Sequence, residues 1–261
     1  MGIFVAALLA TALGVWMGYG LLRVWVGWDR CHLRVLAFTL FFSPAVNLLA
    51  KRPILGFLLR RFHLANHRPA WPWWFAALSL LVVGICEEGI KATPALFPSV
   101  RETIRSRGSA VPMALTIGLG FALGEIWFLA WGIYHSDPTT ARLPFYMLGG
   151  FIGERVFTIV LHSFLILPAL HGLLIGPRRF ALGLAASMLL HALVDVVPAL
   201  YQMKLVGPEL AGLLLLAITL GAAIPLYKYA KHRAALNRLA LLSTSSRVLY
   251  VRPEKDAPPQ K

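Results

Sequence analysis

The sequence predicts an all-α protein, a polytopic transmembrane helical bundle of about seven spans, and two observations support this prediction. Of the 261 residues, 58% are hydrophobic and only 14% are charged, whereas soluble domains carry about 25% charged residues. Apolar runs of about 20 residues, long enough to cross a bilayer as a helix, recur along the chain. A transmembrane β-barrel is excluded because its strands alternate in hydrophobicity over about ten residues, whereas the long Leu, Ala and Val runs of this chain do not alternate.

We expect a single transmembrane domain over residues 1–230, followed by a basic tail at residues 231–261. The expected spans are Ile3–Leu22, Leu33–Ala50, Ala70–Lys91, Val111–Tyr134, Leu143–His171, Phe180–Gln202 and Glu209–Tyr229. The first run follows no basic segment and precedes Arg23 rather than a small-residue cleavage site. We therefore interpret it as a retained helix and not as a signal peptide.

Local features predict where these helices bend or pack closely. Pro44 lies in the second half of the second span, where a proline is expected to kink the helix. The segment Lys51–Arg68 contains an apolar patch, Ile54–Leu59, that is too short to span the membrane. We expect an interfacial helix there, with a re-entrant segment as the alternative. Gly120 and Gly124 are four residues apart, a spacing that lets a neighbouring helix approach closely.

The formal net charge of +14 indicates a membrane topology rather than a nucleic acid partner. Lys and Arg gather in the cytoplasmic loops of membrane proteins, and we find no basic soluble domain that would carry nucleic acid binding. Their distribution favours an integral membrane protein with its N-terminus outside and its C-terminus in the cytoplasm, although the basic Lys51–Arg68 segment does not fit this orientation. The membrane that we expect is a prokaryotic plasma membrane. The tail is predicted to form a juxtamembrane helix that contacts anionic lipid, with a disordered end.

The third predicted span ends in a cluster of charged residues, Glu87, Glu88 and Lys91. Charges inside a bilayer are costly, so ionisable residues within spans are functional candidates. On a helix, Lys91 is three residues after Glu88 and four after Glu87, so it can pair with either acid and leave the other available for chemistry. The alternative is that Lys91 and Glu88 only neutralise each other near the interface.

Later spans carry five further candidates: Glu125, Arg155, His162, His191 and Asp195. His191 and Asp195 are four residues apart, so one helix face presents an imidazole and a carboxylate together. Arg155 and His162 are seven apart and also share a face. Two structural alternatives stay open: His162 as a buried polar group, and Arg155 as a clamp for Glu125 or Asp195.

The order of these residues resembles the PrsW-type intramembrane proteases of the Abi/CAAX-prenyl protease superfamily. The resemblance covers about residues 85–195 and rests on Glu87-Glu88-x-x-Lys91, Phe121-x-x-x-Glu125 and His191-x-x-x-Asp195. PrsW proteins commonly have Asn after the second acid, where this chain has Ile126. The neighbouring YhfC-type intramembrane metalloproteases share much of the pattern. The resemblance implies a multi-helix bundle in which these motifs meet around one buried site.

Our hypothesis from the sequence is intramembrane peptide-bond hydrolysis of a membrane protein or a lipidated peptide. Glu87, beside Glu88, would activate a water as general base. His191, oriented by Asp195, would bind the reacting water or the oxyanion, and Glu125 would complete the site. The supporting residues would be Lys91, Arg155 and His162.

Metal dependence and two other functions stay open at this point. Glu125, His162 and His191 could together hold one Zn²⁺, because catalytic zinc sites use three protein ligands plus water. The same buried charges would also suit a proton- or ion-coupled transporter, although we find no internal repeat. A catalytically silent scaffold of the same fold is the third interpretation.

Overall fold

Helix is the only regular secondary structure among residues 2–25, 29–64 and 71–248, the parts of the chain that this computed structural model describes. In lipid every backbone polar group needs a partner within the protein, and a helix provides these partners within a single segment. The helices are α1 (Gly2–Trp25), α2 (Arg30–Val46), α3 (Arg52–Arg61), α4 (Trp73–Ala92), α5 (Pro98–Arg107), α6 (Val111–Ser136), α7 (Pro138–Arg142), α8 (Gly149–Ile175), α9 (Pro177–Val194), α10 (Val196–Gln202) and α11 (Pro208–Val248). Short irregular turns are the π-helix η1 (Asn47–Lys51) and the 3₁₀ helices η2 (Thr93–Leu96) and η3 (Phe145–Leu148).

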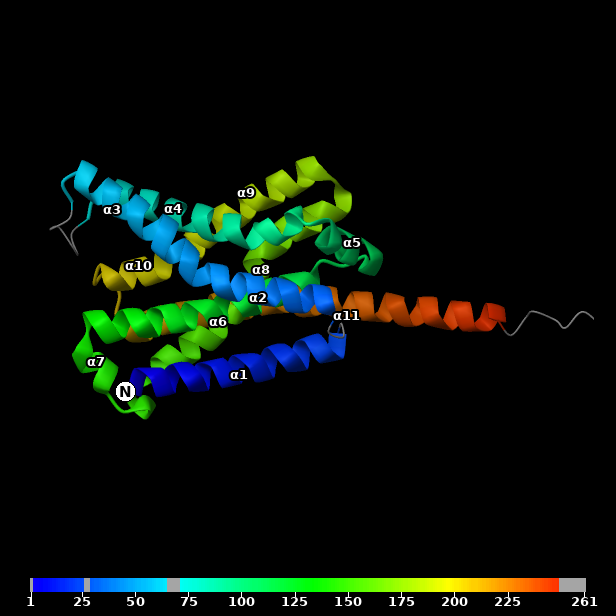
Figure 1. The fold of residues 1–261 in the computed structure, drawn as a ribbon, viewed down its shortest axis with the longest axis horizontal. Helices are drawn as coiled ribbons and strands as arrows, with labels where there is room; N and C mark the ends of the chain where they lie inside the picture. Colours follow the sequence, from blue (N-terminus) through cyan, green and yellow to red (C-terminus); the bar gives the residue numbers. More distant parts are fainter. Residues whose placement is uncertain (1, 26–28, 65–70, 249–261) are drawn as a thin grey trace, which may run out of the picture.

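The lengths and hydropathies of these helices match a polytopic bundle of about seven spans. Six helical segments of the described chain are long and apolar enough to cross a membrane, and Gly2–Gly18 is a shorter apolar helix. The six are Arg30–Arg61, Trp73–Leu96, Val111–Ser136, Phe145–Ile175, Pro177–Gln202 and Pro208–Lys228. The N-terminus and the end of α11 lie at opposite ends of the bundle (Figure 1). Which end faces the cytoplasm stays a prediction.

Helix α6 forms the centre of the bundle and packs against α1, α2 and α8. It is apolar on all sides, as expected for a helix surrounded by others. A Cβ at Gly118 would collide with Ser163 of α8, and one at Gly120 or Gly124 would collide with the backbone carbonyls of Leu36 or Leu40 in α2. The predicted close packing at Gly120 and Gly124 is therefore confirmed.

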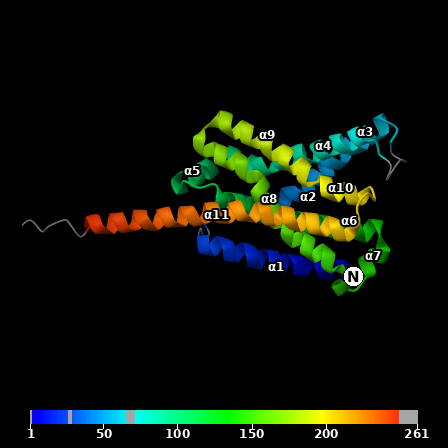
Figure 2. The ribbon, with the colours of Figure 1, turned by 180° about the vertical axis from the view of Figure 1, so that it is seen from behind.

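A second close contact joins α4 to α9, which lie alongside each other (Figure 2). A Cβ at Gly84 of α4 would collide with the carbonyl oxygen of Met188 in α9. One helical turn beyond this contact, α4 carries Glu87 and Glu88, and α9 carries His191. The glycine therefore lets the two helices approach closely enough for these polar side chains to meet.

The second span does not end at Ala50 as predicted. The helix continues from Arg30 to Arg61 through the π-helical turn η1, which begins three residues after Pro44. Proline and π-turns are common causes of irregularity within a helix. The interpretation of Lys51 as part of a separate interfacial segment is therefore wrong. Residues 65–70, which include the end of that predicted segment and the first residue of the third span, lie outside the described residues.

Two other predicted segments are divided differently in the structure. The sixth predicted span consists of α9 and the short helix α10, which meet at Asp195. At the other end of the bundle, α11 continues without interruption to Val248, beyond the candidate span Pro208–Lys228, so the first part of the predicted tail is helical and continuous with the last helix. The Pro-rich end at 249–261 lies outside the described residues.

Candidate active site

The charged end of α4 is fully inside the bundle, because Glu87, Glu88 and Lys91 are all buried. Lys91 Nζ lies 2.6 Å from Glu88 Oε1 and 3.9 Å from Glu87 Oε2. The ammonium also lies 4.6 Å from the centre of the Phe121 ring of α6, a distance typical of a cation–π interaction. Of the two acids, Glu88 is thus the closer partner of Lys91.

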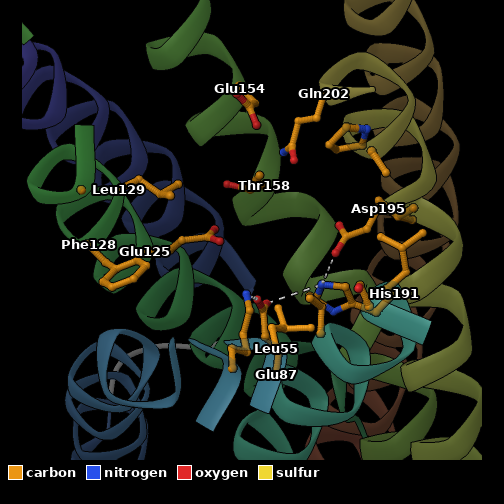
Figure 3. Close-up of a pocket in the computed structure, with 18 of the residues that line it drawn as sticks. Leu55, Glu87, Glu125, Phe128, Leu129, Glu154, Thr158, His191, Asp195 and Gln202 are labelled. Atoms are coloured by element: carbon orange, nitrogen blue, oxygen red, sulfur yellow. Dashed lines mark hydrogen bonds and ion pairs between the residues drawn. The ribbon is translucent and has the colours of Figure 1, made fainter. Parts of the chain in front are cut away.

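His191 of α9 brings the two acids and Asp195 together. Its Nδ1 lies 2.6 Å from Glu88 Oε1. Its Nε2 lies 3.5 Å from Glu87 Oε2 and 3.5 Å from Asp195 Oδ2 (Figure 3). A carboxylate bonded to one ring nitrogen selects the tautomer and aims the other nitrogen. Glu88 therefore orients His191 so that Nε2 faces Glu87.

Glu125 of α6 organises the other half of the site with two residues of α8. Arg155 Nη1 lies 2.9 Å from Glu125 Oε2, and His162 Nε2 lies 3.3 Å from the same oxygen. Arg155 also pairs with Glu154. Arg155 therefore clamps Glu125, which was one of its two expected partners.

His162 connects the two halves, because its Nδ1 lies 2.8 Å from Lys91 Nζ. An ammonium group only donates hydrogen bonds. Nδ1 of His162 must therefore accept, which places the ring proton on Nε2, where it points to Glu125. The ring also packs edge-on against Phe121 at 5.0 Å. Phe121 thus supports both Lys91 and His162, which explains why an aromatic residue four positions before Glu125 suits this site.

A cavity of about 1120 Å³ leads to these groups. Glu87, Glu125 and His191 line its inner part, and Glu154 and Gln202 lie farther out (Figure 3). Its lining also includes Ser136 at the end of α6, Trp71 just before α4 and Met203 just after α10. These positions lie at the end of the bundle that holds the N-terminus (Figure 1). The cavity therefore runs from that end to the buried acids.

Lys51 is the site residue that sequence reasoning missed. It lies in η1, lines the cavity and pairs with Glu87 Oε1. Its side chain is only 14% exposed. A usable signal was present: the apolar run that begins near Leu33 resumes after Lys51 and Arg52 as Ile54–Leu59, as it would in one long helix interrupted by two adjacent cations.

The structure groups a different set of possible metal ligands from the one proposed on sequence. One ligand atom each from Glu87, His162 and His191 lie within 4.8 Å of one another, whereas the sequence hypothesis had Glu125 in place of Glu87. Two histidines and a glutamate are a ligand set of zinc hydrolases. Oε2 of Glu87 is buried and has no hydrogen-bond partner among the described residues, so it is free to bind a cation.

The balance of charges in the site also fits a cation. The network of described ion pairs contains five carboxylates and three permanently charged cations: Glu87, Glu88, Glu125, Glu154 and Asp195, against Lys51, Lys91 and Arg155. Two positive charges are missing if both histidines are neutral. One divalent ion would balance the network, whereas protonation of His191 alone would leave one negative charge, because His162 is neutral when its Nδ1 accepts from Lys91.

Comparison with known protein families matches residues 31–224 to the PrsW family intramembrane metalloproteases. This match spans well over half of the chain. The chain belongs to this family. No curated protein and no solved structure gave a significant match. Membership confirms the resemblance that the three motifs indicated, and it makes the chain an integral membrane protein and, at the level of the family, an intramembrane protease.

Proposed function

We propose that this PrsW family member is an endopeptidase that cleaves membrane-associated protein substrates at the inner end of the cavity. The observation that carries the proposal is the free Oε2 of Glu87, buried 3.5 Å from Nε2 of His191. A buried carboxylate oxygen beside an oriented imidazole is a suitable place to hold and deprotonate a water molecule.

The cavity suits a peptide better than a small molecule. Its volume of about 1120 Å³ exceeds the about 300–1,000 Å³ of a small-ligand pocket. Its lining includes apolar side chains, such as Leu55, Phe75 and Leu80, and polar groups, such as Thr158 and Gln202. An extended segment of a membrane protein could place its apolar side chains against the former and its backbone against the latter.

In the proposed reaction Glu87 accepts the proton of the attacking water and later delivers it to the leaving amine. His191, held by Glu88 through Nδ1, uses Nε2 to bind the water or the developing oxyanion. Asp195 faces the same nitrogen and keeps the imidazole in place. Glu125 and Arg155 border the opposite side of the cavity, where they would position the substrate backbone.

In the metal-dependent alternative Glu87 would be a ligand instead of the base, and the ion would be held by Glu87 Oε2, His191 Nε2 and one nitrogen of His162. Such an ion supplies Lewis-acid polarisation of the scissile carbonyl group. The first two atoms are available as they stand, and Glu88 on Nδ1 of His191 is the carboxylate–histidine arrangement typical of metal ligands. His162 would have to release either Lys91 or Glu125, and the longer contact is that with Glu125, at 3.3 Å.

The transporter hypothesis is less well supported. Alternating access requires a path from the site to both sides of the membrane. The lining residues that lie at helix ends, Trp71, Ser136 and Met203, all belong to one end of the bundle. A cavity that is open at one end is what a hydrolase needs for water and substrate.

The test is to express the wild-type chain in a bacterial host and to label the new N-termini that appear in membrane proteins. Glu87→Gln and His191→Ala are expected to lower the cleavage rate by about 10²–10⁴-fold, the usual contribution of a general base. Arg60→Met, on the exposed side of α3, is the control and should match wild type. An unchanged set of N-termini in the Glu87→Gln variant would sink the proposal.

Metal content measured on the purified protein tests the ligand set separately. A stoichiometric transition metal in wild type that is lost in Glu87→Gln and in His191→Ala would support it. A metal that both variants retain must be bound elsewhere.

A further inference from the structure

Lys51 reaches the active site because of an irregular turn in its helix. It is the last residue of the π-helix η1, in which the backbone N–H of Arg52 bonds to the carbonyl of Asn47, five residues earlier. One extra residue in a helical turn rotates everything after it by about 100°. The turn therefore determines which side chain of this helix faces α4 and which faces elsewhere.

The next residue shows the consequence of this rotation. Arg52 points to α6, where its guanidinium lies 4.7 Å from the centre of the Phe128 ring, while Lys51 points to Glu87 of α4. Two consecutive cations of this helix thus face two different helices, Lys51 towards α4 and Arg52 towards α6. Isolated π-turns within α-helices are rare and frequently occur at functional sites.

Because Lys51 contacts one oxygen of Glu87 and not the other, the two oxygens can have different roles. Lys51 pairs with Oε1, and Oε2 is left without a hydrogen-bond partner, facing Nε2 of His191. A carboxylate held at one oxygen cannot rotate freely about its terminal bond. The pair therefore keeps Oε2 aimed at the place where the water or metal would bind.

The other cations of the site are committed to different acids. Lys91 lies 2.6 Å from Glu88 and 2.8 Å from His162, but 3.9 Å from Glu87. Arg155 forms ion pairs with Glu125 and Glu154. Among the described residues, Lys51 is accordingly the cation in direct hydrogen-bond contact with Glu87.

We propose that Lys51 is a positioning residue for Glu87: it holds Oε1, neutralises the buried carboxylate and keeps Oε2 directed at His191. The role rests on the proposed function, in which Glu87 is the general base. None of the three motifs includes Lys51, which lies 36 residues before Glu87. Partners that orient an active-site ligand or base typically contribute about 10–100-fold to activity.

The functional test uses a synthetic peptide copied from the most abundant Glu87-dependent cleavage site, with the purified full-length protein in detergent. We expect Lys51→Met to lower kcat by about 10–100-fold and to leave KM within about twofold, because Lys51 acts through Glu87. Lys51→Arg should recover part of kcat, since it restores a cation of greater reach. Arg60→Met is the matched control for loss of a cation from the same helix.

Equal kcat in wild type and Lys51→Met would overturn the positioning role while leaving the proposed function intact. A complete absence of Glu87-dependent cleavage in wild type would overturn both. A large rise in KM without loss of kcat would also contradict the proposal, because it would make Lys51 a substrate contact.

A double-mutant cycle of thermal unfolding tests the ion pair without a substrate. The variants are Lys51→Met, Glu87→Gln and the two combined. Because each single change leaves the other group buried without its partner, the loss of Tm in the double variant should be smaller than the sum of the two single losses. Additive losses would show that the two side chains do not interact, and the positioning role would fail.

Discussion

Two clusters in this protein contain the same kinds of group at nearly the same distances, yet only one is a candidate for chemistry. The first joins Asp29, His32 and Arg107 where α2 begins near α5. His32 Nδ1 lies 2.7 Å from Asp29 Oδ1, and Arg107 Nη2 lies 2.7 Å from Asp29 Oδ2. Asp29 also accepts the backbone N–H of His32 and so caps α2. Its carboxylate is 38% exposed.

The second cluster joins Glu88, His191 and Lys91 between α4 and α9. His191 Nδ1 and Lys91 Nζ each lie 2.6 Å from Glu88 Oε1. Here the side chains of Glu88 and Lys91 are 0% exposed, and a further acid and a cavity adjoin the imidazole. The difference teaches that composition does not identify the reactive cluster. Burial, which strengthens electrostatic interactions, and a neighbouring space for substrate distinguish the two.

The largest expected difference between the clusters is in stability. Lys91→Met leaves Glu88 buried without its lysine and removes one of the two partners of His162, so we expect a loss of about 3–5 kcal/mol in the free energy of unfolding. Arg107→Met removes the cation of the half-exposed cluster and should cost less than about 1 kcal/mol. Thermal unfolding in detergent would measure both. Equal losses would show that burial does not separate the clusters.

A change at the opposite side of the cavity should act on cleavage. Glu125→Gln keeps the size of the side chain but weakens its pairing with Arg155 and His162. We expect about a 10–100-fold lower cleavage rate, the usual cost of losing an orienting partner. Asp137→Asn, at the exposed start of α7, is the matched control. Wild-type cleavage rates in the Glu125→Gln variant would remove Glu125 from the site.

The smallest expected effect concerns pH and the Asp29 cluster. Partial burial raises the pKa of Asp29, but the hydrogen bonds from His32 and the charge of Arg107 outweigh it, so the pKa lies below the ordinary aspartate value. A carboxylate with a lowered pKa stabilises the folded state above its ordinary pKa and loses this contribution as the pH falls through the lowered one. The Tm difference between wild type and Asp29→Asn should therefore be present at neutral pH and should vanish in strong acid. A difference that grew with acidification would have the wrong sign.

Much of the fold could be predicted because membrane helices follow from local rules. Length and hydropathy identify spans, and the spacing of Gly120 and Gly124 predicted a close contact with a neighbouring helix, which the structure shows to be α2. The three motifs could be found because residues three or four apart share a helix face. That reasoning placed Lys91 beside Glu88 and His191 beside Asp195, as the distances of 2.6 Å and 3.5 Å show.

The remainder depended on contacts between distant segments. Sequence spacing could not decide whether Glu87 or Glu125 would lie with the two histidines, because each acid is on a different helix from both. Lys51 was assigned to an interfacial segment because the apolar patch that follows it, Ile54–Leu59, is too short to span the membrane. In the folded chain a π-turn carries the helix onward, and Glu87 supplies the partner that makes a buried lysine tolerable.

The sequence by itself determined that this protein is a helical membrane bundle with three charged motifs on separate spans, because periodicity and hydropathy are local properties of the chain. Only the tertiary structure decided that Glu87, His162 and His191 meet. It also decided that Glu88 orients His191 while Lys91 neutralises Glu88, and that Lys51 holds Glu87. Those pairings depend on the close approach of α4 to α9 at Gly84 and on one extra residue in the turn before Arg52. Both are features of how helices pack, which no single helix determines.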